Sequence, residues 1–118
     1  DTVTARAVAE TDVWVTDGWY VRFGMSETAD GRDDTPEQVA RFVPERDLLM
    51  GYVEAAHQES MRRIAKLSPE DLAKPATVSA RNVERPLWRS LANLVMDFTQ
   101  HIGQIAYVRG LISGFGWH

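Results

Sequence analysis

Three side chains near the C-terminal end have the types and spacing to form a polar site, and two of them could bind a divalent metal ion. Asp97 and His101 lie four residues apart, and Gln104 follows three residues later, so on a helix they project from neighbouring turns of one side. A carboxylate and an imidazole at this spacing form a frequent two-ligand module for a divalent metal. The alternative is structural: Asp97 accepts a hydrogen bond from His101, and Gln104 makes an ordinary interhelical hydrogen bond.

The surrounding sequence predicts the helix that must carry these residues. Apolar residues recur at alternating intervals of four and three, with His101 in the same register, at positions Leu87, Leu91, Leu94, Phe98, Ile105, Val108 and Ile112. This pattern predicts a helix from about Pro86 to Ile112 with one apolar stripe. We expect the stripe to be buried, so that its ionisable pair needs a partner, a water molecule or a metal.

Other polar residues are candidates for the same site. His57 falls near the middle of a second predicted helix, from about Glu45 to Lys66. If the two helices pack antiparallel, His57 is a candidate third ligand; otherwise it is a partly exposed histidine without a role. Tyr107 and Arg109 are candidates to orient an anionic substrate, although Arg109 near a helix C-terminus also interacts with the helix dipole.

The remaining chain predicts an all-α protein. In the predicted helix from Glu45 to Lys66, an apolar face is marked by Leu49, Val53, Ala56, Ser60, Ile64 and Leu67. Thr35-Pro36-Glu37-Gln38 has the pattern of a capping box with proline at the first helical position. A helix is also expected from Ala5 to Val15, then a structured loop or broken helix holding Trp19, Tyr20 and Phe23. The segment from Ala73 to Arg85 reads as a crossover, with no strand pair.

Composition limits the classes of function. The 118 residues predict a single domain, 1–118, and the formal net charge of −4 without a basic run argues against nucleic-acid binding. The chain has no cysteine, which excludes disulfides and thiolate ligands. No apolar run of 18 residues suggests a membrane span, so cytoplasmic residence is the default expectation.

The run His101-Ile102-Gly103-Gln104-Ile105-Ala106-Tyr107-Val108-Arg109-Gly110-Leu111 resembles the closing helix of the DinB-like superfamily. More narrowly, it is similar to the branch near mycothiol-dependent maleylpyruvate isomerase-type domains. Upstream segments agree in order and spacing, namely Trp14, Asp17-Gly18-Trp19, Arg22-Phe23-Gly24, Asp34 to Val39, Leu48-Leu49, Tyr52 and Leu67 to Leu72. The resemblance covers the chain from about Trp14 onward.

The resemblance implies an up-down-down-up four-helix bundle with a divalent metal, often zinc or nickel. Family members hold it with one histidine from the second helix and an H-x-x-x-H pair from the last. Asp97 stands where the first histidine of that pair is expected, and His101 matches the second. The remaining ligand is expected upstream of Asp1, with helix 1 and part of helix 2, so we expect the bundle to be incomplete in this chain.

Two functions follow from these observations. One is a metal-dependent enzyme, a small-thiol-dependent S-transferase or isomerase, acting on a small molecule with a low-molecular-weight thiol, with Gln104, Tyr107 and Arg109 as catalytic candidates. The other is a non-catalytic helical module for small-ligand binding or dimerisation. Two long helices cannot cover the apolar faces near Leu49–Val53–Ile64 and Leu91–Leu94–Ile105, so we expect a homodimer. The alternative is a monomer whose core is completed by residues upstream of Asp1.

Overall fold

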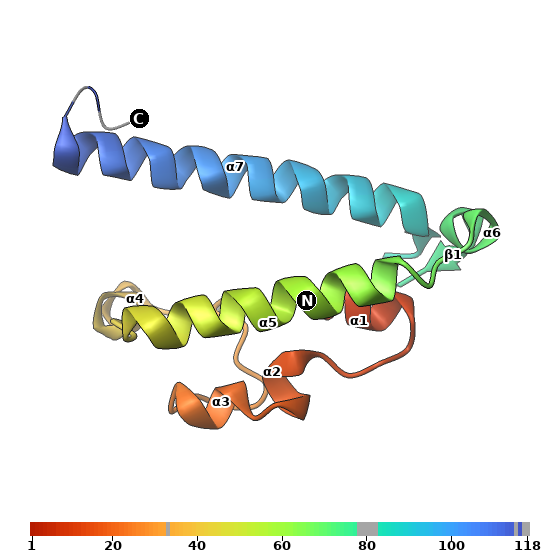
Figure 1. Cartoon of the computed structure of the whole chain (residues 1–118), viewed down its shortest axis with the longest axis horizontal. Coiled ribbons are helices and arrows are strands. Elements are labelled where there is room, and N and C mark those ends of the chain that lie inside the picture. The colour runs from red at the N-terminus through yellow and green to blue at the C-terminus, as the bar shows by residue number, and fades with distance from the viewer. Residues whose placement is uncertain (33, 78–82, 115, 117–118) are drawn as a thin grey trace. The chain divides into compact units, whose positions relative to one another are not determined.

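The computed structural model describes residues 1–32, 34–77, 83–114 and 116, which are mainly α-helical (Figure 1). The chain separates into two compact units, residues 1–68 and 69–118. The first unit holds the helices α1 (Thr2–Ala7), α2 (Val13–Thr16), α3 (Trp19–Arg22), α4 (Pro36–Arg41) and α5 (Arg46–Ile64). The second holds the helix α6 (Pro69–Ala73), the strands β1 (Pro75–Ala76) and β2 (Arg85–Pro86), and the helix α7 (Leu87–Ser113).

The two long helices and the capping box are confirmed. Both α5 and α7 begin and end within two residues of the predicted bounds. At the start of α4, the Gln38 amide donates to Thr35 Oγ1 at 3.3 Å, and the Thr35 amide donates to Gln38 Oε1 at 2.7 Å. These reciprocal bonds satisfy backbone donors that a helix start otherwise leaves unpaired.

Two local predictions were wrong. The helix expected from Ala5 to Val15 is broken into α1 and α2, with Ala9 at a φ of 55° in the turn between them. At this turn the Val13 amide donates to Asp1 Oδ2 at 2.8 Å, a bond that a continuous helix would not allow. The crossover contains a short antiparallel strand pair, in which Pro75 faces Pro86 and Ala76 faces Arg85; residues 78–82 of this crossover lie outside the described residues.

The aromatic residues of the first unit form a packed cluster. Trp19 is only 7% exposed, and its ring centroid lies 5.6 Å from that of Tyr52 on α5. The ring centroid of Trp14 lies 5.4 Å from that of Tyr52 and 5.6 Å from that of Phe23. Phe23 in turn stacks on Phe42. These separations are typical of stabilising aromatic contacts in a core. The segment after α2 is therefore structured and contains the short helix α3, in agreement with the structured loop or broken helix that its aromatic content predicts.

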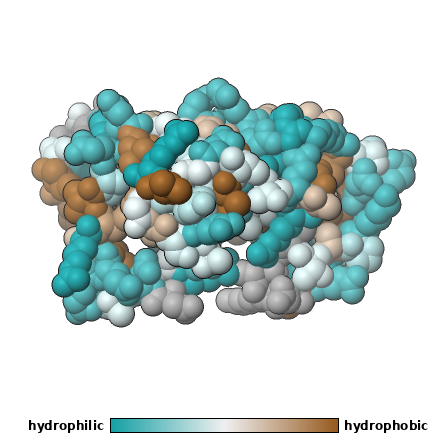
Figure 2. Space-filling view, turned by 90° about the horizontal axis from the view of Figure 1, so that it is seen from below, coloured by the Kyte–Doolittle hydropathy of each residue, from teal (hydrophilic) through white to brown (hydrophobic). Residues whose placement is uncertain are grey.

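The face of α5 that packs in the first unit overlaps the predicted apolar face only in part. Arg63 is buried, and the hydroxyl oxygens of Ser60 and the buried Thr4 lie 3.0 Å apart in a hydrogen bond. Leu49, Val53 and Ile64 are 39%, 50% and 40% exposed. Large apolar residues are thus part of the molecular surface. Figure 2 shows hydrophobic residues among hydrophilic ones on one face of that surface. Arg63 packs inwards on this helix because it has charged partners, Asp1 and Glu10, in the N-terminal segment.

Arg63 and its acceptors form what we call the Arg63 cluster: Arg63, Asp1, Glu10, Thr11 and Glu59. The Arg63 side chain is 2% exposed and that of Asp1 is 4% exposed. Arg63 donates to Asp1 Oδ1 at 2.5 Å, to the Thr11 carbonyl at 2.7 Å and to Glu10 Oε2 at 3.2 Å. Its Nε lies 3.4 Å from Glu59 Oε1. The cluster ties the turn between α1 and α2 to the end of α5.

The lowered pKa of Glu10 predicts that the fold loses stability in acid. A hydrogen bond from Lys66, together with those from Arg63 and Arg62, lowers the pKa of Glu10 from 4.5 to about 2. Because the folded pKa lies below the unfolded one, the Glu10 carboxylate stabilises the fold above about pH 4.5, and this contribution is lost as the pH falls towards 2. We expect the urea midpoint to fall over this window, and Glu10→Gln to flatten the dependence. Equal pH profiles for the two proteins would contradict this assignment.

Candidate metal centre

The helix α7 supplies all the residues of the predicted site. It runs for 27 residues from Leu87 and ends at Gly114, whose φ of 73° is left-handed and favours glycine. Within the second unit, α6 and β2 pack against its first part, where Leu87 and Ser90 are buried. The middle of α7, which carries Asp97, His101 and Gln104, therefore projects beyond the packed end of the unit.

The three side chains meet as the spacing predicts. His101 Nε2 lies 3.7 Å from Asp97 Oδ2, and His101 Nδ1 lies 2.9 Å from Gln104 Oε1. The two nitrogens of one ring thus face two different partners on successive turns of the helix. The structure brings together the two proposed ligands and the amide that follows them.

The hydrogen bond to Gln104 is consistent with one tautomer of His101. An amide oxygen only accepts, so with the Gln104 amide in this orientation Nδ1 carries the proton and donates to Oε1. In the neutral imidazole, Nε2 is then left with its lone pair on the side of Asp97. This is the arrangement found at metal sites, where the ring nitrogen that does not bind the metal donates to an oxygen acceptor.

The expectation that this pair is buried was wrong. The side chains of Asp97 and His101 are each 61% exposed. The large apolar residues that follow on the stripe are exposed as well, with Phe98 at 55%, Ile105 at 67% and Ile112 at 81%. The pair therefore pays little desolvation energy and needs no buried partner. Periodicity identifies which side of a helix is apolar, but not whether another element covers it.

No third ligand is present in the described part of the chain. Over residues 1–32, 34–77, 83–114 and 116, no group of three or more His, Asp or Glu side chains is arranged to hold a metal ion. His57 lies on α5 of the first unit, where it is exposed. Within the described residues, Asp97 and His101 are therefore a pair of candidate ligands without a third.

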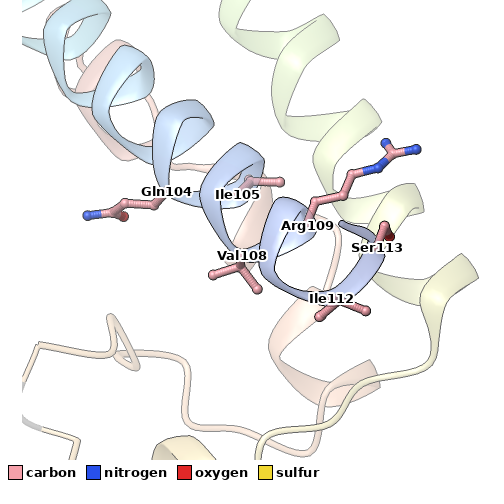
Figure 3. Close-up of a pocket in the computed structure, with 6 residues that line it drawn as sticks. All are labelled: Gln104, Ile105, Val108, Arg109, Ile112 and Ser113. Atoms are coloured by element: carbon pink, nitrogen blue, oxygen red, sulfur yellow. The ribbon is translucent and has the colours of Figure 1, made fainter. Parts of the chain in front are cut away.

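The other candidate residues lie towards the end of α7. Gln104, Ile105, Val108, Arg109, Ile112 and Ser113 line a surface pocket. Figure 3 shows Gln104 extending from one side of the helix and Arg109 from the other, with Val108 and Ile112 between them. Tyr107 is 69% exposed and is not among these lining residues. Two residues apart on a helix, Tyr107 and Arg109 point about 200° apart, so they lie on different sides of α7.

The comparisons with known proteins identify no family for this chain. A scan against protein-family models finds no match, and a search of curated proteins finds no similar sequence. Within the described residues, no helix combines the length and the apolar character needed to cross a membrane. The residues of α7 are therefore the remaining indication of a function.

Proposed function

We propose that this chain is a divalent-metal-binding helical domain of the DinB-like type, in which Asp97 and His101 bind the metal. The observation that carries the proposal is the geometry of His101, whose Nδ1 is held by Gln104 at 2.9 Å while Nε2 faces Asp97 at 3.7 Å. Gln104 is then a positioning residue, which fixes the ring and its tautomer without touching the metal. Zinc or nickel suits this imidazole and carboxylate donor set.

The donor separation fits one coordination sphere. Two ligands that are each about 2.1 Å from zinc at tetrahedral corners lie about 3.4 Å apart. The two donor atoms here are 3.7 Å apart, so a small rotation of either exposed side chain brings both onto one ion. The remaining positions are open to ligands from outside α7 or to a substrate.

The proposed activity is that of a small-thiol-dependent S-transferase or isomerase acting on a small molecule. The likeness of residues 101–111 to the closing helix of DinB-like proteins supports this assignment, and α5 and α7 would be two long helices of an up-down-down-up bundle. A bound divalent metal would supply a Lewis acid that lowers the pKa of a coordinated thiol. The protein's part is to hold that ion through Asp97 and His101, and Arg109 supplies a cation for an anionic substrate.

Metal titration of the purified chain tests the proposal. We expect Zn²⁺ or Ni²⁺ to bind in isothermal titration calorimetry, His101→Ala to abolish binding, and Gln104→Ala to weaken it by about 10–100-fold. His57→Ala is the matched control, because His57 is an exposed histidine on α5, and it should bind as the parent does. If the parent chain bound neither metal, or if His101→Ala bound with unchanged affinity, the proposal would be wrong.

The second function, a non-catalytic module, is favoured by one observation. Only two ligands gather within the described residues, and both are 61% exposed, whereas a catalytic metal normally has three protein ligands and a shielded open position. Cobalt substitution separates the two functions. A thiolate-to-cobalt absorption band on adding a small thiol supports the enzyme, and an unchanged spectrum of the cobalt-loaded chain supports the module.

A further inference from the structure

We infer that α7 of one chain pairs antiparallel with α7 of a second copy, and that Asp97 and His101 of both copies together bind one zinc ion. The inference rests on the proposed metal site and names the source of its missing ligands. Because it fills every coordination position with protein ligands, it belongs with the second, non-catalytic function. Each chain brings two ligands, and a closed structural zinc site takes four. Two copies related by a two-fold axis supply four ligands, because each copy presents the same surface of α7.

The stripe on α7 has the pattern of a helix-pairing seam. Alternating steps of three and four define heptad positions a and d. Position a is filled by Leu91, Phe98, Ile105 and Ile112, and position d by Leu87, Leu94, His101 and Val108. Over the part beyond Leu94, the large apolar members are more than half exposed. A single polar residue at one core position is the kind of feature that fixes register and orientation at such seams.

When the apolar stripes of the two α7 helices overlap over their full length, His101 lies near the centre of the seam. In an antiparallel pair, a residues face d residues of the partner, and the seam from Leu87 to Ile112 has its midpoint between residues 99 and 100. Leu94 then faces the partner's Ile105, and Phe98 faces the partner's His101. At 1.5 Å per residue, His101 lies about 2.3 Å along the helix from the two-fold axis, and Asp97 lies about 3.8 Å from it on the other side.

Antiparallel pairing also gathers the carboxylates. Asp97 occupies position g, beside the seam, and so does Gln104. In an antiparallel pair the two g positions lie on one flank, through which the two-fold axis passes, whereas in a parallel pair they lie on opposite flanks. A shift by one heptad would move the axis by about 3.5 residues along the helix, which places either Asp97 at about 9 Å or His101 at about 7.5 Å from it, depending on the direction of the shift. One metal ion can therefore reach all four side chains only in the antiparallel, fully overlapped register.

Light scattering and zinc analysis of the full 118-residue chain test this inference. With Zn²⁺ we expect a species of twice the 13.3 kDa chain mass, containing one zinc per two chains, that dissociates with EDTA. His101→Ala and Asp97→Asn, both at exposed positions, should each raise the dimer dissociation constant by more than about 100-fold. His57→Ala should behave as the parent.

The outcomes separate the inference from the proposed function. A monomer with one zinc per chain would overturn the inference and keep the metal site, and a chain that binds no zinc would overturn both. A dimer that persists in EDTA and in His101→Ala would show that zinc does not bridge the copies. Because the chain has no cysteine, a spin label can be attached at Ser113→Cys alone, and the distance between the two labels of the dimer gives the relative orientation of the helices. We expect about 40 Å for antiparallel helices, and about 10 Å would indicate parallel ones.

Discussion

Replacing Arg63 with methionine is expected to lower the free energy of unfolding by about 3–5 kcal/mol. The Arg63 side chain is 2% exposed, and it donates to Asp1, Glu10 and the Thr11 carbonyl. Methionine fills a similar volume but leaves the 4% exposed Asp1 carboxylate without its cation. An unpaired buried charge costs far more than the loss of the pair's attraction.

Arg62 provides the matched control. It is the neighbouring arginine, its side chain is 43% exposed, and it also pairs with Glu10 and Glu59. Exposed ion pairs contribute about 0–1 kcal/mol, so Arg62→Met should shift the urea midpoint only slightly. Urea unfolding followed by near-UV circular dichroism, to which the packed Trp14 and Trp19 contribute, measures both. Equal losses for the two variants would show that burial of Arg63 is not what stabilises the first unit.

The two long helices were predictable because their signals are local and agree with one another. The segment of α7 repeats its apolar residues at every step except His101 and ends at Gly114. Thr35 and Gln38 are likewise a local capping signal, since both partners lie within one turn. Such features need no knowledge of the rest of the chain.

The Arg63 cluster could not be predicted because its partners are far apart in the sequence. Arg63 lies 62 residues from Asp1 and 53 from Glu10, and an arginine beside an arginine on a helix usually indicates a solvated face. The same interaction explains the break between α1 and α2, because a continuous helix from Ala5 to Val15 would carry Glu10 away from its position in the turn. A non-local ion pair here outweighs local helix propensity.

The sequence predicted which residues form the candidate site, but not how exposed to solvent they are. The spacing of Asp97, His101 and Gln104 predicts their contact, and the distances confirm that contact. Their exposure depends on what covers α7, which no pattern within the helix records.

Truncation of Trp19 to alanine is the second change with a large expected effect, about 3–5 kcal/mol of unfolding free energy. Trp19 is 7% exposed and packs against Phe23 and Tyr52, so alanine leaves a cavity at the centre of the first unit. Trp19→Phe is the control. It keeps an aromatic ring and removes Nε1, a buried donor for which the described residues provide no acceptor, so its cost should be much smaller.

Gly51 tests whether the Trp19 indole itself sets this packing. A Cβ at Gly51 would lie 3.1 Å from Trp19 Cη2, so in the parent chain this contact offsets the gain of about 1 kcal/mol that alanine brings to a helix interior. Phenylalanine has no atom equivalent to Cη2, so Gly51→Ala should stabilise the Trp19→Phe protein by about that amount. A double-mutant cycle from urea unfolding measures the coupling. Additive effects would mean that the close approach of α3 to α5 does not depend on the indole, because the coupling requires both the added Cβ and the distal ring.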